Sequence, residues 1–130
     1  MSNTISKNFF RVIRPGINTT YQDIGRNNLY HIGIPFSGAM DKRNYILANK
    51  LSGNKYNSAV IEFAYQGPLL KFYGNKVNFV ITGNVKFKII TKKGEIEGNC
   101  YENYYLEDGD QIDIISTYKS VYGYFSISGI

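Results

Sequence analysis

The chain has 130 residues, the length of one domain, and its 43% hydrophobic and 19% charged residues are typical of a folded globular protein. Its single cysteine, Cys100, cannot close an internal disulfide, and its single histidine, His31, leaves too few soft ligands for a structural zinc site. These counts exclude disulfide scaffolds, zinc modules and multidomain machines. We expect residues 1–130 to form a single domain without a metal site.

The formal net charge of +5 raises the question of nucleic-acid binding, because a basic face binds phosphate by releasing counterions. The densest basic group, Lys86, Lys88, Lys92 and Lys93, alternates along an expected strand and its turn, which is typical of a solvated strand face. Lysines and aromatic residues do not interleave on one predicted face, as a β-barrel that stacks single-stranded nucleic acid would require. We favour no nucleic-acid partner and keep that barrel as the weaker alternative.

The amino-terminal stretch MSNTISKNFF has no apolar core of the kind that secretory leaders carry. No apolar run approaches the roughly 18 residues that a membrane-spanning helix needs. We therefore expect a reduced, cytoplasmic protein that does not enter the membrane.

Two short strands are predicted near the N-terminus, Phe10–Ile13 and Thr19–Ile24, on either side of the turn Arg14-Pro15-Gly16. The only stretch that breaks the β pattern follows them, and it predicts one amphipathic helix over Asp41–Leu51. Asp41 is able to cap its start, and Gly53 lies just past its end. Tyr45, Ala48, Asn49 and Leu51 fall near one face of this helix.

Short runs of aromatic and β-branched residues, bounded by Gly, Asn and Asp, predict strands over the rest of the chain. They are Ala59–Tyr65, Leu69–Tyr73, Val77–Thr82, Val85–Thr91, Glu95–Glu97, Asn103–Leu106, Gln111–Ser116 and Val121–Ser128. Lys92-Lys93-Gly94 and Glu107-Asp108-Gly109-Asp110 are hairpin or turn signals, and their spacing predicts antiparallel pairing. We expect a mainly β fold, an antiparallel barrel or sandwich with one short helix packed over an open edge or end.

The segment from Arg14 to Asn54 carries more unusual residues at fixed spacing than a generic β domain needs. The pieces are Arg14-Pro15-Gly16, Thr19-Thr20, Gln22-Asp23, Gly25-Arg26, His31, Gly33, Pro35, Ser37-Gly38-Ala39-Met40-Asp41, Ala48-Asn49 and Gly53-Asn54, continued by Glu62, Gly67-Pro68, Phe72 and Thr82-Gly83. On these residues the chain resembles the N-terminal part of the A-like carboxyltransferase family, also known as allophanate hydrolase subunit 2, the C subunit of 5-oxoprolinase or the KipI antagonist. It departs from the family at Asn27-Asn28, where Pro-Gly is usual, and at Asn84, where a small residue is usual.

The resemblance implies the N-terminal domain of a cyclophilin-like two-domain family, with the C-terminal cyclophilin-like half absent from residues 1–130. It implies a truncated or split A-like component of a carboxyltransferase or ATP-dependent 5-oxoprolinase complex, a hydrolase that acts on amide or lactam C–N bonds and is inactive alone. The implied partners are a KipI-like or B-like carboxyltransferase protein and a separate C-terminal half. A noncatalytic interaction module that binds a KipI-like partner is the alternative.

Neither a biotin-attachment Met-Lys-Met nor a phosphate-cradling Gly-rich loop occurs in the sequence. We therefore expect no cofactor on this chain, with ATP or biotin carried by partner subunits. Transfer of a carboxyl or acyl group further needs hydrogen-bond donors for a developing oxyanion and a group that handles a proton.

His31 and Arg26 are the candidate catalytic residues, His31 because an unperturbed imidazole titrates near neutrality. A packed loop in which His31 bonds a backbone carbonyl is the favoured alternative, and Arg26 could instead form a structural ion pair with Asp23. The candidate substrate-binding residues precede or open the helix, whose N-terminus attracts anionic oxygen. They are Gln22, Ser37, Gly38, Ala39, Met40 and Asp41, although capping is the favoured role of Asp41.

Asn49 and Glu62 are polar residues inside apolar stretches, so each needs a hydrogen-bond partner if it is buried. We expect partners within the protein rather than a ligand. The Tyr-rich C-terminal region is expected to supply core and cross-strand pairs, and any exposed subset would mark a docking surface.

Overall fold

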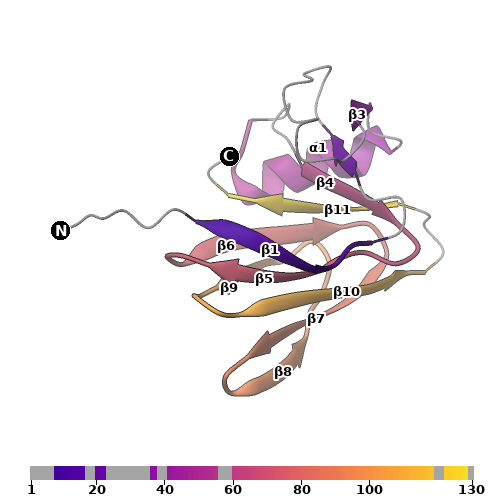
Figure 1. The fold of residues 1–130 in the computed structure, drawn as a ribbon. Helices are drawn as coiled ribbons and strands as arrows, with labels where there is room; N and C mark the ends of the chain where they lie inside the picture. The colour runs from indigo at the N-terminus through magenta and orange to yellow at the C-terminus, as the bar shows by residue number, and fades with distance from the viewer. Residues whose placement is uncertain are drawn as a thin grey trace.

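The structure, a computed structural model, describes residues 8–16, 20–22, 36–37, 41–55, 60–118 and 122–128. Two β-sheets lie face to face, and one helix, α1 (Lys42–Ser52), covers the outer side of one of them (Figure 1). The predicted mainly β fold with one short helix is therefore confirmed. Of the two predicted arrangements, the two separate sheets make it a sandwich.

The first sheet has five strands, and every neighbouring pair is antiparallel. Their order is β1 (Phe9–Arg14), β5 (Leu69–Tyr73), β10 (Gln111–Thr117), β7 (Val85–Thr91) and β8 (Gly94–Glu97). Along β7, buried Phe87 and Ile89 alternate with the more exposed Lys86 and Lys88, because one face of the sheet packs in the sandwich and the other meets solvent. This alternation confirms the prediction that these lysines lie on a solvated strand face.

The second sheet has six strands, in the order β3 (Phe36–Ser37), β2 (Thr20–Gln22), β4 (Val60–Ala64), β11 (Tyr122–Ile127), β6 (Val77–Thr82) and β9 (Asn103–Leu106). All its pairs are antiparallel except β2 with β3, which is parallel. The central strands β4, β11 and β6 are buried along most of their length, because the core covers one face and α1 the other. Double coverage explains why these strands read as nearly continuous apolar runs in the sequence.

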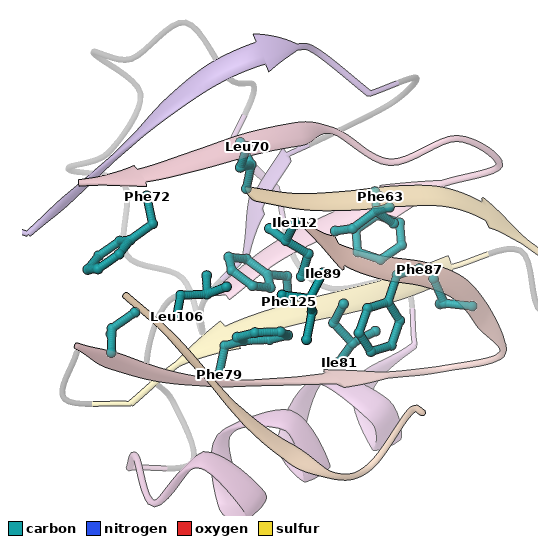
Figure 2. Packing of buried hydrophobic residues seen from close by; sticks show 13 residues of the cluster. Phe63, Leu70, Phe72, Phe79, Ile81, Phe87, Ile89, Leu106, Ile112 and Phe125 are labelled. Atoms are coloured by element: carbon teal, nitrogen blue, oxygen red, sulfur yellow. The ribbon is translucent and has the colours of Figure 1, made fainter. Parts of the chain in front are cut away.

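The main core fills the space between the two sheets with aromatic and aliphatic side chains (Figure 2). Five of its members are phenylalanines that are at most 1% exposed, namely Phe63, Phe72, Phe79, Phe87 and Phe125. The Phe79 ring centroid lies 5.4 Å from that of Phe125 and 6.2 Å from that of Phe87, so the rings bridge the two sheets. Burial of each such side chain contributes about 2–3 kcal/mol, which makes this core the rigid base under the helix.

Helix α1 begins and ends close to where the sequence predicts. Gly53 ends it with a left-handed φ of 83°, as a C-cap glycine does. Its buried residues are Tyr45, Ala48, Asn49 and Ser52, so Ser52 takes the place expected for Leu51, which is half-buried. Among the described residues, no helix is long and apolar enough to cross a membrane.

The prediction that this helix shields an open edge or end of the sheet is wrong. α1 instead packs on the outer face of the six-stranded sheet, against β6, β11 and β4, away from the five-stranded sheet (Figure 1). The physical reason lies in polar side chains on both surfaces. Ser52 of the helix shares a 2.8 Å hydrogen bond with Ser126 of β11, and Thr82 of β6 donates one to the Asn44 carbonyl at 2.7 Å, so the central strands hold the helix.

One of the two predicted turns joins strands of different sheets instead of closing a hairpin. The turn at Lys92–Gly94 does connect the antiparallel pair β7–β8, but the turn at Glu107–Asp110 leads from β9 in one sheet to β10 in the other. Antiparallel pairing is confirmed for the strands on both sides of each turn, but the second turn does not close a hairpin. Both turns place a glycine at positive φ, Gly94 at 127° and Gly109 at 89°, so the local signal is correct and only the partner strand differs.

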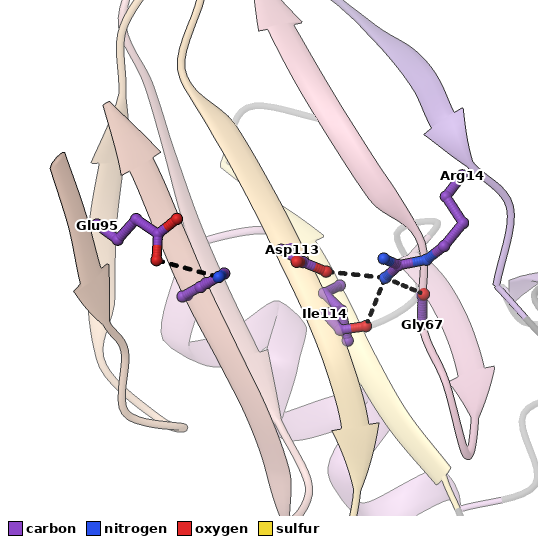
Figure 3. A network of polar contacts seen from close by, with 6 residues as sticks. Arg14, Gly67, Glu95, Asp113 and Ile114 are labelled. Carbon is purple, nitrogen blue, oxygen red and sulfur yellow. Dashed lines mark hydrogen bonds and ion pairs between the residues drawn. The ribbon is translucent and has the colours of Figure 1, made fainter. Parts of the chain in front are cut away.

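Arg14, at the end of edge strand β1, ties that strand to the rest of its sheet. Its Nη2 donates hydrogen bonds to Asp113 Oδ1 at 2.8 Å, to the Gly67 carbonyl at 3.1 Å and to the Ile114 carbonyl at 3.2 Å (Figure 3). Gly67 passes so close to β10 that a Cβ there would lie 2.3 Å from the Ile114 side chain. Arg14 thus fastens β1 at the point where the chain crosses between the sheets.

Candidate functional site

Two of the predicted substrate-binding residues are brought together by the parallel pair β2–β3. Gln22 of β2 lies in register with Ser37 of β3, and Tyr21 with Phe36. The strand predicted over Thr19–Ile24 contains β2, while its residues 19, 23 and 24 lie outside the described part. β3 has no counterpart in the sequence-based prediction, because a strand of two residues carries no periodicity.

Asp41 caps helix α1, as the favoured interpretation predicts. Its Oδ1 accepts a hydrogen bond from the Asn44 backbone N–H at 3.2 Å, and its Oδ2 accepts one from Asn44 Nδ2 at 2.8 Å. A carboxylate at this position satisfies a free backbone N–H group and offsets the positive end of the helix dipole. Both oxygens of Asp41 therefore have helix partners.

The start of the helix is also fastened to the sheet beneath it. The Asp41 backbone N–H donates to the Tyr124 hydroxyl at 2.8 Å, and that hydroxyl donates to Glu62 Oε2 at 2.5 Å. Thr82 Oγ1 donates to the Asn44 carbonyl at 2.7 Å. Glu62, Tyr124 and Thr82 are buried and lie in one row across β4, β11 and β6, so the centre of the sheet holds the first turn of the helix.

The Tyr124 hydroxyl serves as a fixed donor rather than an acid. Burial raises the pKa of Tyr124 far above its ordinary value, and the hydrogen bond to Glu62 raises it further, while the Asp41 N–H acts in the opposite direction. The phenol therefore keeps its proton at any physiological pH. It can position Glu62 and Asp41 without taking part in proton transfer.

The far end of the helix has its own buried polar contacts. Ser126 of β11 lies 2.8 Å from Ser52 Oγ and donates to Asn49 Oδ1 at 3.4 Å, and Asn54 Nδ2 donates to the Ile127 carbonyl at 2.7 Å. Asn49 is fully buried and Glu62 is 3% exposed. Both residues have partners within the protein, as predicted.

The structure places three of the eight candidate site residues: Gln22 and Ser37 in the parallel pair, and Asp41 at the helix start. The others lie outside the described residues, namely Arg26, His31, Gly38, Ala39 and Met40. The proposed Asp23–Arg26 ion pair lies outside them as well. Sequence reasoning gave no site role to Tyr124, Thr82 or Asn44. Thr82 entered only among the residues that carry the family resemblance, and Tyr124 and Asn44 show only a hydroxyl or carboxamide within a segment that is otherwise apolar or helical.

Comparison with known proteins gives one family and several partial relatives. The family model described as "Carboxyltransferase domain, subdomain A and B" matches residues 32–130. Urea amidolyase of Lachancea kluyveri is 39% identical over 77 residues, which cover 58% of this chain and 4% of that protein. The C subunit of 5-oxoprolinase from Haemophilus influenzae is 32% identical over 110 residues, which cover 85% of this chain and 34% of that protein.

The fold is also shared with a solved structure. The crystal structure of Kluyveromyces lactis urea amidolyase superposes with a TM-score of 0.78 at 29% identity, over 97% of this chain and 7% of that one. The chain thus spans at most about a third of the length of each of these relatives.

Proposed function

This chain belongs to the carboxyltransferase domain family, and on that premise we propose that it is the A-like part of an assembly that acts on amide or lactam C–N bonds. The names of two relatives support this substrate class, since urea amidolyase refers to urea and 5-oxoprolinase to a lactam. Both compounds contain an amide-type C–N bond. In the proposed assembly the chain contributes binding and orientation, and it needs further polypeptide for turnover.

The observation that carries the proposal is the register of β2 and β3. It brings a carboxamide residue and a hydroxyl residue, Gln22 and Ser37, to adjacent positions although they are far apart in the chain. The chain then runs from Ser37 within four residues to Asp41 at the start of α1. Hydrogen-bond donors gathered at a helix start suit the oxygen of an amide or carboxyl group.

The proposed roles follow from the chemistry of each residue. Ser37, Arg26 and the backbone N–H groups of residues 38–40 donate hydrogen bonds to the oxygen that becomes negative in the transition state. His31 moves the proton on nitrogen. The clamp formed by Glu62, Tyr124 and Thr82 supports these roles, because donors held rigidly before the reaction need no reorganisation during it.

A companion chain is part of the proposal. We propose that a B-like carboxyltransferase chain, related to KipI, completes the site, and that ATP or carboxybiotin is bound by partner subunits. One relative is by its name a component of a larger enzyme, and this chain covers 34% of it. The Gly-rich loop or biotin-attachment sequence that would bind these groups is not found in this chain.

The test is co-expression with the B-like chain, followed by assays of 5-oxoproline-dependent ATP hydrolysis and of biotin-dependent carboxylation of urea. Arg26→Ala, His31→Ala and Ser37→Ala should each lower turnover by at least about 100-fold, the usual effect of losing an oxyanion donor or a general acid–base group. Lys93→Ala, which removes an exposed cation from the β7–β8 turn, is the control and should leave turnover unchanged. Turnover of wild type with no loss in the three variants would remove these residues from the site.

A second candidate is a noncatalytic module that binds a KipI-like partner, and one observation favours it. Edge strand β1 exposes three apolar side chains, Phe9, Val12 and Ile13, at 55%, 56% and 46%. Such an edge offers both backbone hydrogen bonds and apolar area to another chain. Stable binding of the B-like chain without any turnover, lost in Val12→Lys, would favour this function over the first.

A further inference from the structure

An open depression of about 520 Å³ lies beside the start of α1, on the side away from the β2–β3 pair. Three segments form it: the first turn of the helix, the turn between β6 and β7, and the loop that joins β8 to β9. The side chains and backbone of Asn44, Gly83, Asn84, Asn99, Cys100 and Tyr101 make up most of its lining. Its size falls within the range of about 300–1,000 Å³ that small-molecule sites occupy.

The wall of the depression is held in a strained conformation. Tyr101 has a positive φ of 67°, which costs a residue with a side chain on the order of 1–2 kcal/mol. Its N–H donates to the Ile81 carbonyl at 2.7 Å, and its hydroxyl donates to Asn44 Oδ1 at 2.6 Å and accepts from the Gly83 N–H at 3.1 Å. These three bonds fix the loop against both the helix and the β6–β7 turn. Strain that the surroundings maintain is concentrated at ligand sites.

The loop is further fixed at its other end by a close approach to the core. Gly98 donates its N–H to the Phe87 carbonyl at 3.1 Å, and a Cβ at Gly98 would lie 2.2 Å from the Phe87 ring. The depression therefore exists before any ligand arrives. A preformed site loses less entropy on binding than one that must order itself.

The lining is polar but carries no charge. Every lining residue is described, and none is acidic or basic. Burial raises the pKa of the Cys100 thiol, which donates to the Val85 carbonyl at 3.4 Å, so it too is neutral. The carboxamides of Asn84 and Asn99, both exposed, have no side-chain partner within the described residues. Each offers one acceptor and two donor hydrogens to a ligand.

From this lining we propose that the depression is a binding site for an uncharged secondary amide group, which Asn84 and Asn99 recognise through paired N–H and C=O hydrogen bonds. A planar amide presents one donor and one acceptor side by side, as a carboxamide does, so the two are complementary. A carboxylate or an ammonium group would find no counter-charge here and would lose hydration on entering.

The inference deepens the proposed function, and it rests on that function only for the source of the amide. One source is a small uncharged lactam or ureide that the assembly would act on, which excludes 5-oxoproline itself because its carboxylate would find no counter-charge here. The other is the backbone of a polypeptide loop. The binding chemistry is the same in both cases, so the experiment begins with the amide group and then separates the sources.

The experiment is an NMR titration of the full ¹⁵N-labelled chain. 2-Pyrrolidinone presents the cis secondary amide of a lactam, cyclopentanone is its ring-matched control without N–H, and N-acetylglycine N-methylamide presents trans peptide groups. We expect saturating shift changes for 2-pyrrolidinone, with a Kd on the order of 1–10 mM for so small a ligand, at the amides of residues 83–85 and 98–101. Cyclopentanone should bind at least about fivefold more weakly, since it lacks one hydrogen bond.

Matched variants locate the contacts. Asn84→Ala and Asn99→Ala should each weaken 2-pyrrolidinone binding by about 3–10-fold, the effect of one neutral hydrogen bond. Asn75→Ala, at an exposed position of the β5–β6 turn, should change nothing. Because Asn84 and Asn99 are exposed, their replacement leaves the fold intact.

Either amide binding more tightly than its rival identifies the source and supports the site. Equal binding of cyclopentanone and 2-pyrrolidinone, shifts that do not saturate, or equal affinities of Asn84→Ala, Asn99→Ala and Asn75→Ala would overturn it. The readout needs no partner, so its failure is distinguishable from that of the proposed function. If the complex shows turnover but the chain binds neither amide, only the binding site in the depression is refuted. If the chain binds an amide but the complex shows no turnover, only the proposed function is refuted.

Discussion

Replacing Tyr124 by Phe tests whether the sheet holds the start of α1 through a single phenol. The hydroxyl accepts a hydrogen bond from the Asp41 N–H at 2.8 Å and donates one to Glu62 Oε2 at 2.5 Å. Phe preserves the ring, which packs edge-on against Tyr45 with centroids 6.4 Å apart. The substitution therefore removes the two hydrogen bonds and leaves the packing in place.

The expected loss follows from the burial of the groups left behind. A hydrogen bond to a neutral group contributes about 1 kcal/mol to stability, and one to a carboxylate about 1.5–3 kcal/mol. With Tyr124 fully buried, Glu62 3% exposed and Asp41 half-buried, water has little access to either bond. Tyr124→Phe should therefore lower the free energy of unfolding by about 3 kcal/mol. In a domain of this size that corresponds to a fall in Tm of about 9–15 °C.

Urea unfolding followed by circular dichroism measures this difference directly. Tyr105→Phe is the matched control, because Tyr105 is 60% exposed and its ring lies under the Lys76 ammonium. That control should change stability by less than about 0.5 kcal/mol. If Tyr124→Phe and Tyr105→Phe unfold at the same urea concentration, the phenol does not hold the helix and the argument for a clamped N-terminus fails.

Wild type and Tyr124→Phe should also differ in how the free energy of unfolding depends on alkaline pH. An unfolded tyrosine loses its proton near pH ~10, whereas burial, and then the bond to Glu62, raises the pKa of folded Tyr124 well above that. Above pH ~10 the unfolded state thus binds fewer protons than the folded state, and stability falls as pH rises. Wild type should lose about 1.4 kcal/mol per pH unit relative to Tyr124→Phe in this range. A stability gap that stays constant between pH 9 and pH 11, roughly the range that spans this titration, would contradict the assignment.

Two further predictions concern the sheets. Arg14→Met should lower the free energy of unfolding by about 2 kcal/mol, because Asp113, whose side chain is only 16% exposed, then has no ion-pair partner. Lys88→Met breaks an ion pair whose acid is 57% exposed, so it should lower this free energy by less than about 0.5 kcal/mol in the same urea assay. Gly98→Ala should lower the free energy of unfolding by about 1–3 kcal/mol, because the added methyl group would collide with the Phe87 ring. Thermal unfolding followed at two wavelengths would detect a loss of this size. An unchanged Tm would show that the loop moves aside without strain.

Local features of this fold could be predicted from the sequence where they depend on only a few neighbouring residues. The helix limits follow from Asp41, which supplies the cap oxygen, and from Gly53, which takes positive φ. The lysine alternation on β7 follows from a sheet with one wet face. The assignment of each strand to one of the two sheets could not be predicted. The Glu107–Asp110 turn would have the same sequence whether it closed a hairpin or led the chain from one sheet to the other.

The position of the helix on the sheet could not be predicted for a related reason. Its buried face carries Ser52, a residue that a hydrophobic pattern assigns to the surface, and Asn49, for which the sequence indicates the need for a partner but not which residue supplies it. They are buried because Ser126 on β11 provides a hydrogen-bond partner. Ser126 lies more than 70 positions away in the chain, so the sequence around the helix does not indicate it. Likewise Tyr124 looks like one more strand aromatic, and only its distance to Glu62 and Asp41 reveals that it holds the candidate site.

Asn44 shows how the two candidate sites depend on each other. Its Nδ2 donates to the Asp41 cap, its carbonyl accepts from Thr82, and its Oδ1 accepts from the strained Tyr101. One carboxamide thus spans the distance between the helix start, where the substrate-binding residues were predicted, and the wall of the depression. The two candidate sites therefore meet at one residue, which holds both the helix cap and the wall of the depression in place.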